Sequence, residues 1–312
     1  MEYRRLGTTG MKVSAIGLGG NTFGNTADEA ASISVIQQAM ELGVNHIDSA
    51  DGYGNGKSEE YVGKAVQGRR HDMVIATKVA GRVGEGPNDR GLSRKHIMDG
   101  VESSLKRLNT DYIDLFYAHQ FDPDTPIEES VRAFDDLVRQ GKVRYLACSN
   151  WQAWQMAHGL SIQERLSLSR FVAVQPAWNV VDGLADPHLE DACSALGVGI
   201  VPYRPMGSGV LTGKYRRGEP PQPGTRAADN PRIGRMLTGS MLDAVDVLKP
   251  WAEARGHTVG QLAIAWLLAH PVVSSVIVGA RNPDQVVENA AAGEWTLTTE
   301  ERDEVRQLVL GG

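Results

Sequence analysis

The chain has 312 residues, of which 41% are hydrophobic and 22% charged, and its net charge is −6 at pH 7. These ordinary values leave enough apolar material for a large core. The acidic balance argues against a nucleic-acid-binding protein, because phosphate backbones require a basic surface. The most apolar segment, Gln261 to Val273, is interrupted by His270-Pro271 and is too short to span a bilayer, so we expect no membrane segment.

Cysteine usage and the N-terminal residues indicate the compartment. The two cysteines, Cys148 and Cys193, stand in unrelated contexts without a CxxC motif, so neither a disulfide framework nor a cysteine metal site is expected. The first ten residues lack the apolar core of a signal peptide. These features predict a cytoplasmic protein.

Short apolar runs recur along the chain, each followed by a polar or glycine-containing loop and a helical pattern. In the helices, apolar residues repeat every three or four positions, as in Ile33, Ile36 and Met40. The predicted strands are Ala15–Leu18, Val44–Ile47, Met73–Ala76, Tyr112–Phe116, Val143–Ala147, Phe171–Val174, Gly199–Pro202 and Ser275–Val278.

Signals for helix ends accompany this pattern. Thr26 with Glu29, and Thr125 with Glu128, resemble capping boxes, in which two side chains satisfy the first free backbone amides of a helix. Glycines at 43 and 141 follow the last apolar residues of two helices and are expected to be C-caps.

Two segments fall outside the repeat. Glu2–Arg5 and Lys12–Ser14, on either side of Thr9-Gly10, predict an N-terminal β-hairpin that would plug the floor of a barrel. The stretch rich in glycine and proline from Gly218 to Pro231 follows the seventh strand. We interpret it as a long loop inserted into the domain, not as a linker between domains.

Strands that alternate with helices form a parallel sheet, because consecutive parallel strands need a crossover connection. Both a closed barrel and an open doubly wound sheet fit this order. The open sheet would usually carry a glycine-rich nucleotide fingerprint after its first strand, but Thr22 stands where the third glycine belongs. We therefore predict an α/β fold, a (β/α)8 TIM barrel, as one domain over residues 1–312.

The residues that carry out chemistry in such a barrel lie at the carboxyl ends of its strands. Those ends supply Asp48, Tyr53, Lys78 and His119. An ammonium near a phenol favours the phenolate and lowers the phenol's pKa, and a carboxylate keeps the ammonium charged. A histidine beside them can orient a carbonyl oxygen. Together the four residues predict a general acid that faces a carbonyl group.

Each of these residues has an ordinary interpretation by itself, such as a turn aspartate or a partly buried histidine. Their occurrence at three consecutive strand ends favours catalysis. Two apparent motifs fail: the P-loop-like segment at Gly56-Lys57-Ser58 has Asp51 where its first glycine should be. His46 and Asp48 resemble a metal pair, but no other strand end supplies the further ligands of a barrel metallohydrolase, so no metal is predicted.

Longer motifs closely resemble the aldo-keto reductase family. They read IDSADGYGNGKSEEYVGKA, ATKV, YIDLFYAHQFDP, GKVRYLACSN, VQPAWNV, VPYRPMGSGVLTGKY and VIVGARNPDQVVENAAA, and they span nearly the whole chain. The resemblance implies the catalytic tetrad Asp48, Tyr53, Lys78 and His119. It also implies reduction of an aldehyde or ketone with NADP(H), or the reverse oxidation.

The same resemblance implies a set of cofactor contacts. Ser149, Asn150 and Gln175 match the residues that hold the nicotinamide carboxamide, and Tyr203 matches the aromatic that stacks on the ring. Gly207 to Lys214, with Gly207, Gly209, Leu211, Gly213 and Lys214, matches the loop over the pyrophosphate, and further cofactor contacts are Gly20, Asn21, Asp48 and Arg204. The matches at the adenosine end are Gly279, Ala280, Arg281, Gln285 and Asn289. Arg281 suits a 2′-phosphate and so favours NADPH over NADH, although a salt bridge with Asp284 or Glu288 is an alternative.

Departures from the family pattern bear on the substrate. Asn21 stands where many aldehyde reductases have tryptophan, and Arg204 adds a charge near the cofactor. With Tyr53 and His119, Asn21 is expected to contact a small carbonyl substrate, and a polar pocket for sugars or hydroxylated carbonyls follows. A second hypothesis is a cofactor-sensing subunit with little turnover. A third is a metal-dependent hydrolase. The sequence does not indicate whether the protein is a monomer or a homo-oligomer.

Overall fold

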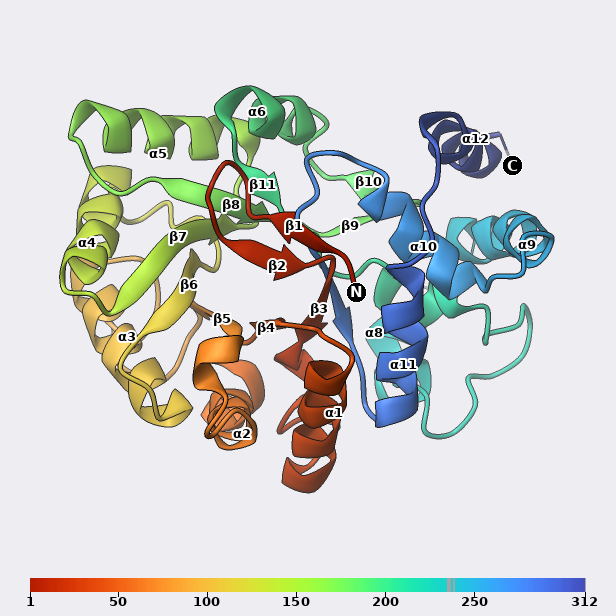
Figure 1. Ribbon diagram of the computed structural model, residues 1–312, viewed down its shortest axis with the longest axis horizontal. Coiled ribbons are helices and arrows are strands. Elements are labelled where there is room, and N and C mark those ends of the chain that lie inside the picture. Colours follow the sequence, from red (N-terminus) through yellow and green to blue (C-terminus); the bar gives the residue numbers. More distant parts are fainter. Residues whose placement is uncertain (235–236, 238, 312) are drawn as a thin grey trace.

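In the computed structural model, which describes residues 1–234, 237 and 239–311, eight parallel strands form the central sheet (Figure 1). In chain order they are β3 (Ile16–Gly19), β4 (His46–Asp48), β5 (Val74–Val79), β6 (Ile113–Ala118), β7 (Val143–Ser149), β8 (Phe171–Gln175), β11 (Gly199–Ile200) and β12 (Val276–Gly279). All eight predicted strands are present, with ends within three residues of the prediction.

The strand order shows how the sheet curls into a barrel. Strands β3 to β8 follow one another as neighbours, β11 pairs with β8, and β12 pairs with β3. Parallel bridges from Ile200 to Val273 and from Tyr203 to Ile277 join the two ends of the sheet. The expected (β/α)8 architecture is confirmed.

Helices surround the strands on the outside of the barrel (Figure 1). They are α1 (Glu29–Glu41), α2 (Lys57–Ala65), α3 (Arg94–Leu108), α4 (Ile127–Arg139), α5 (Ala153–Arg165), α6 (Leu189–Leu196), α7 (Arg226–Asp229), α8 (Pro231–Gly234), α9 (Ser240–Glu253), α10 (Val259–Leu268), α11 (Pro283–Ala292) and α12 (Thr299–Leu310). Short 3₁₀ turns are η1 (Gly20–Thr22), η2 (Tyr53–Gly56), η3 (Arg70–Asp72) and η4 (Gly207–Thr212), and a small hairpin consists of β9 (Trp178–Asn179) and β10 (Gly183–Leu184).

The N-terminal hairpin is confirmed: β1 (Tyr3–Arg5) and β2 (Lys12–Ser14) pair antiparallel. Leu6 and Val13 are fully buried against residues of the barrel interior. Gly7, with φ +55°, approaches the chain where β8 and β11 begin, and a Cβ there would lie 2.6 Å from the carbonyl oxygen of Val172. The hairpin therefore closes the amino-terminal end of the barrel and leaves the other end open.

The predicted helix ends are partly wrong. Asp28, not Thr26, caps α1, and its side chain accepts a hydrogen bond from the amide of Ala31 (2.9 Å). The hydroxyl of Thr125 donates instead to Asp122 (2.7 Å), so α4 has no side-chain cap. In both cases a nearby aspartate, a stronger acceptor, replaces the expected threonine interaction. The glycines at 43 and 141 do adopt the left-handed conformation expected after a helix.

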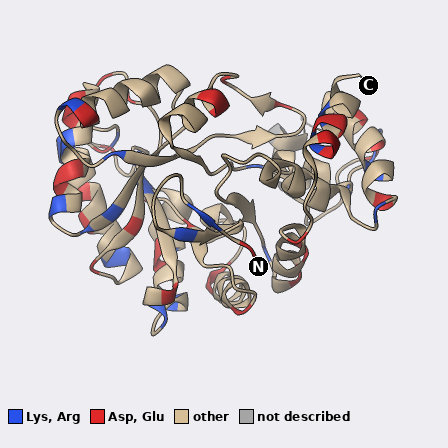
Figure 2. Ribbon diagram, turned by 45° about the horizontal axis from the view of Figure 1, so that its top comes forward, with Lys and Arg blue, Asp and Glu red and all other residues tan. Residues whose placement is uncertain are grey.

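The insertion after the seventh strand also differs from the expectation of a simple loop. Its segment from 218 to 231 includes the short helix α7 and the first residue of α8. Elsewhere, acidic and basic side chains are interspersed on the outer helices (Figure 2), and some pair one turn apart, as Arg132 does with Glu128 at 2.9 Å. Among the described helices, none is long and apolar enough to cross a membrane.

Candidate functional site

A buried ion pair lies at the carboxyl ends of β4 and β5. The ammonium of Lys78 donates to Asp48 Oδ2 and to the carbonyl oxygen of Ser49, each at 2.6 Å. It also approaches the hydroxyl of Tyr53 at 3.4 Å. Lys78 is 0% and Asp48 3% exposed, so the pair is removed from solvent. The structure thus brings together three residues of the predicted tetrad.

The fourth residue, His119, follows β6 and lies next to the phenol. The rings of Tyr53 and His119 meet edge to face, with their centroids 5.9 Å apart. Burial lowers the pKa of His119 to about 3, and the Lys78 ammonium adds to this effect. The imidazole is therefore neutral at physiological pH and can donate a hydrogen bond to a carbonyl oxygen without carrying charge.

The phenol of Tyr53 departs from the sequence prediction in one respect. Burial raises its pKa above the ordinary value for tyrosine, and the Lys78 ammonium opposes this shift without outweighing it. The expected lowering by Lys78 is thus correct as a contribution and wrong as the net direction. Burial also disfavours the Lys78 ammonium, but Asp48 and Tyr53 reverse the effect and raise its pKa.

Gln175, the last residue of β8, has a role that the sequence did not predict. Its side-chain nitrogen donates to Asp48 Oδ1 at 2.8 Å, so each oxygen of this carboxylate has a partner. A buried charge is tolerated only when it is paired and hydrogen-bonded. Gln175 therefore completes the shell of the ion pair, and no local sequence signal links residues 127 positions apart.

A cavity of about 610 Å³ extends from this cluster across the open end of the barrel. Such a volume is typical of a small-molecule site. Of the predicted residues, the ones that line it are Asn21, Asp48, Tyr53, Gln175, Tyr203, Arg204, Gly209, Lys214, Gly279, Arg281, Gln285 and Asn289. The predicted residues that are not among its lining residues are Gly20, Lys78, His119, Ser149, Asn150, Gly207, Leu211, Gly213 and Ala280.

Three basic side chains, Arg204, Lys214 and Arg281, line the cavity together with the carboxylates of Asp48 and Glu288. Beside Arg204, a turn in η4 places Ser208 and Gly209 in the left-handed conformation. The Arg204 side chain donates to the Ser208 hydroxyl at 2.9 Å. Within this turn, the backbone amides of Gly207 and Gly209 donate to the carbonyl oxygens of Arg204 and Met206, at 3.0 and 2.8 Å.

Arg281 joins the insertion to the far end of the cavity. Its guanidinium donates to the carbonyl oxygen of Gly224 at 3.1 Å, and its backbone amide donates to the Gln285 side chain at 2.8 Å. The cavity thus combines an aromatic ring, amide side chains and three basic side chains in one lining.

Two further features near the carboxyl ends of the strands were missed by sequence reasoning. Phe121 and Trp154 follow the ends of β6 and β7, with ring centroids 6.0 Å apart, and Trp154 is 59% exposed. Asp51, two residues before Tyr53, is only 4% exposed. Within the described part of the chain, neither of its carboxylate oxygens has a hydrogen bond to another side chain. No periodic pattern distinguishes these residues from ordinary loop residues.

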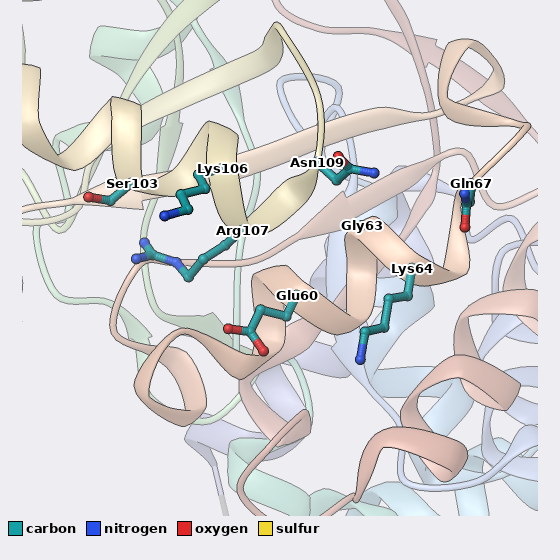
Figure 3. A pocket seen from close by; sticks show the side chains of 8 residues that line it. All are labelled: Glu60, Gly63, Lys64, Gln67, Ser103, Lys106, Arg107 and Asn109. Atoms are coloured by element: carbon teal, nitrogen blue, oxygen red, sulfur yellow. The ribbon is translucent and has the colours of Figure 1, made fainter.

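A second hollow of about 640 Å³ lies on the outside of the barrel between α2 and α3 (Figure 3). It is lined by Glu60, Gly63, Lys64, Gln67, Ser103, Lys106, Arg107 and Asn109. Lys64 pairs with Glu29 at 2.7 Å and Arg107 with Glu59 at 2.6 Å. Because this hollow contains none of the strand-end residues, we assign the site to the cavity at the open end. Among the described residues, no three acidic, histidine or cysteine side chains are grouped to hold a metal ion.

The fold and the site together define a parallel (β/α)8 barrel with a tyrosine beside a buried lysine–aspartate pair at its open end. The sequence model described as "Aldo/keto reductase family" matches residues 15–310, and the chain belongs to this family. The family resemblance expected from the sequence is therefore confirmed.

Individual relatives cover nearly the whole chain. A probable voltage-gated potassium channel subunit beta from Arabidopsis thaliana is 40% identical, over 99% of this chain and 97% of the relative. A putative subunit of the same name from Schizosaccharomyces pombe is 40% identical over 95% and 89% of the two chains. L-glyceraldehyde 3-phosphate reductase from Escherichia coli K12 is 31% identical over 100% and 93%.

The buried carboxyl group of Asp51 predicts a pH-dependent cost to folding. Burial raises its pKa to about 7, and the neighbouring Glu59 adds to the shift. Because the folded state holds the proton more tightly than the unfolded state, the free energy of unfolding falls as pH rises from about 4 to about 7. Asp51→Asn removes this cost, and we expect it to stabilise the protein at pH 8 by about 1–3 kcal/mol.

Denaturant unfolding at pH 8 and pH 5 measures this effect. The stabilisation should be fully present at pH 8 and fall to about a third of that value at pH 5. The exposed Asp111, changed to Asn, controls for the loss of one negative charge. An Asp51→Asn protein that is no more stable than the wild type at pH 8 would show that the carboxylate is well solvated or paired.

Proposed function

We propose that this protein is an NADP(H)-dependent oxidoreductase that reduces aldehydes or ketones to alcohols, with Tyr53 as the proton donor. The observation that carries the proposal is the placement of the Tyr53 hydroxyl 3.4 Å from the buried Lys78 ammonium, at the edge of the cavity. Family membership supports the reaction class. The same groups would serve the reverse oxidation.

In this proposal, the residues divide the work of moving one proton. When bound, a reduced nicotinamide supplies the hydride that the carbonyl carbon receives. The Tyr53 hydroxyl gives its proton to the carbonyl oxygen as negative charge develops there, and Lys78 stabilises the phenolate that remains. Asp48 keeps Lys78 charged and in place, and the neutral His119 orients the carbonyl oxygen.

The cofactor contacts are proposals supported by the shape and charge of the cavity. Gln175 has its side-chain nitrogen on Asp48, which leaves its oxygen for a carboxamide amine. Tyr203 presents its ring to the cavity, and Arg204 and Lys214 suit a pyrophosphate. Arg281 would hold the 2′-phosphate of NADPH, because a guanidinium pairs with two phosphate oxygens at once.

The substrate is proposed to be a sugar or another hydroxylated carbonyl compound. Asn21 is exposed and lines the cavity, which provides an amide for hydroxyl groups. Phe121 and Trp154, which follow β6 and β7, pack edge to face and could offer apolar ring faces to such a substrate. One relative, at 31% identity, is named for the reduction of a phosphorylated hydroxyaldehyde.

A second candidate function is favoured by the names of the other relatives. Proteins 40% identical over nearly the full chain are named as probable or putative potassium channel beta subunits. A sensing subunit would bind NADPH in the same cavity and turn over slowly. Steady-state oxidation of NADPH by the purified protein with a panel of aldehydes distinguishes the two: sustained turnover supports the enzyme, and tight binding without turnover supports the subunit.

Organisation and location are further proposals. We propose one domain for the whole chain, because the barrel closes where β3, near the start of the chain, pairs with β12, near its end. We also propose a cytoplasmic location, for which the free, buried thiols of Cys148 and Cys193 offer support. Burial raises the pKa of both thiols, which makes them unreactive.

The proton-donor role predicts the effect of one oxygen atom. Tyr53→Phe keeps the ring and removes the hydroxyl, so we expect turnover of a model aldehyde to fall by about 100-fold or more. The dissociation constant for NADPH, measured by fluorescence titration, should stay within about twofold, because the ring remains in place. A variant that reduces aldehydes at nearly the wild-type rate would rule out Tyr53 as the acid.

The phosphate contact predicts a change in cofactor preference. Arg281→Ala should raise the dissociation constant for NADPH by about 10- to 100-fold and that for NADH much less, because one charge-assisted contact is lost. Lys214→Ala is the matched control, since a pyrophosphate contact is common to both cofactors. If Arg281→Ala weakens both cofactors equally or neither, the salt-bridge alternative with Asp284 or Glu288 is the better interpretation.

A further inference from the structure

The side chain of Asn150, directly after β7, forms hydrogen bonds through both its nitrogen and its oxygen. Its amide nitrogen donates to the carbonyl oxygen of His119 and to the hydroxyl of Ser149, each at 3.0 Å. Its oxygen accepts a hydrogen bond from the hydroxyl of Tyr203 at 2.8 Å. The Asn150 amide therefore connects Tyr203, which lines the cavity, to His119, which lies beside the Tyr53 phenol.

The backbone holds Asn150 where these contacts are possible. Its φ angle of +58° is left-handed, a conformation that asparagine tolerates better than most residues. Its backbone amide donates to the carbonyl oxygen of Gln175 at 3.1 Å. Unusual backbone conformations of this kind persist where the surrounding structure fixes them, often at functional sites.

His119 depends on its backbone for its orientation. Its amide donates to the carbonyl oxygen of Val79 at 2.9 Å, and its own carbonyl accepts from Asn150. The imidazole makes no hydrogen bond to any described side chain and contacts Tyr53 only through the edge-to-face arrangement. A shift of this carbonyl would therefore move the ring relative to the phenol.

We propose that the Tyr203 hydroxyl and the Asn150 amide form a positioning chain that sets the orientation of His119 from the cofactor side of the site. The inference rests on the proposed function in that His119 acts on the carbonyl group. It assigns Asn150 a role as a positioning residue in addition to its expected contact with the carboxamide. Burial raises the pKa of Tyr203, so its hydroxyl remains a donor across the physiological range.

Tyr203→Phe tests the chain, because it keeps the ring that faces the cavity and removes only the hydroxyl. We expect kcat/KM for an aldehyde to fall about five- to tenfold, the scale of one neutral hydrogen bond, with most of the loss in kcat. The dissociation constant for NADPH should change less than twofold. The matched control is Tyr3→Phe, which removes a hydroxyl bond of the same 2.8 Å length, to the Gly43 carbonyl at the closed end.

A double-variant cycle shows whether the hydroxyl acts through His119. In a His119→Asn background, Tyr203→Phe should cause no further loss of kcat/KM, because the group that it positions is already absent. Multiplicative losses in the double variant would contradict the proposal and assign Tyr203 a separate role.

A readout that needs no turnover separates this inference from the proposed function. In protein labelled with ¹⁵N-histidine, the His119 ring signal is identified among the eight histidines by its absence in His119→Asn. Tyr203→Phe should shift this signal and Tyr3→Phe should not. A wild type without reductase activity would refute the proposed function alone, whereas an unshifted His119 signal would refute the positioning chain.

Discussion

The ion pair between Lys78 and Asp48 is the constraint on which the rest of the site depends. An isolated charge in a protein interior costs several kcal/mol, and the cost is recovered only when partners satisfy its hydrogen-bonding groups. Here the Lys78 ammonium has two acceptors at 2.6 Å, and Gln175 takes the second oxygen of Asp48. Strands β4, β5 and β8 must therefore end in register for the pair to be stable.

The barrel supplies the dry surroundings in which this pair acts. The hairpin of β1 and β2 closes the amino-terminal end of the barrel, and apolar residues fill the interior between the hairpin and the ion pair. Burial favours the uncharged form of both neighbouring groups: the pKa of Tyr53 rises, and the pKa of His119 falls to about 3. The phenol holds a proton and the imidazole is neutral, the protonation states that carbonyl reduction requires.

Sequence reasoning succeeded where information is local. The eight strands of the central sheet contain short apolar, often β-branched runs, so the sequence pattern predicts them, and their ends identify Asp48, Lys78 and His119. The small hairpin of β9 and β10 was not predicted. It failed where groups compete for one role: Asp28 displaced Thr26 as the cap of α1, and burial outweighed Lys78 in setting the pKa of Tyr53. The bonds from Gln175 to Asp48 and from Tyr203 to Asn150 join residues 127 and 53 positions apart, which no motif encodes.

We infer that Lys78 and Asp48 act on Tyr53 as one unit. The most direct test measures kcat/KM for three variants: Lys78→Met, Asp48→Asn and the double variant. The account predicts that Lys78→Met folds with a lower melting temperature, binds NADPH with modest loss and has little reductase activity. The double variant should be no less active than Lys78→Met alone, because Asp48 acts on Tyr53 only through Lys78 and its removal then causes no further loss. A Lys78→Met protein with wild-type rate and pH profile, or fully multiplicative losses in the double variant, would contradict it.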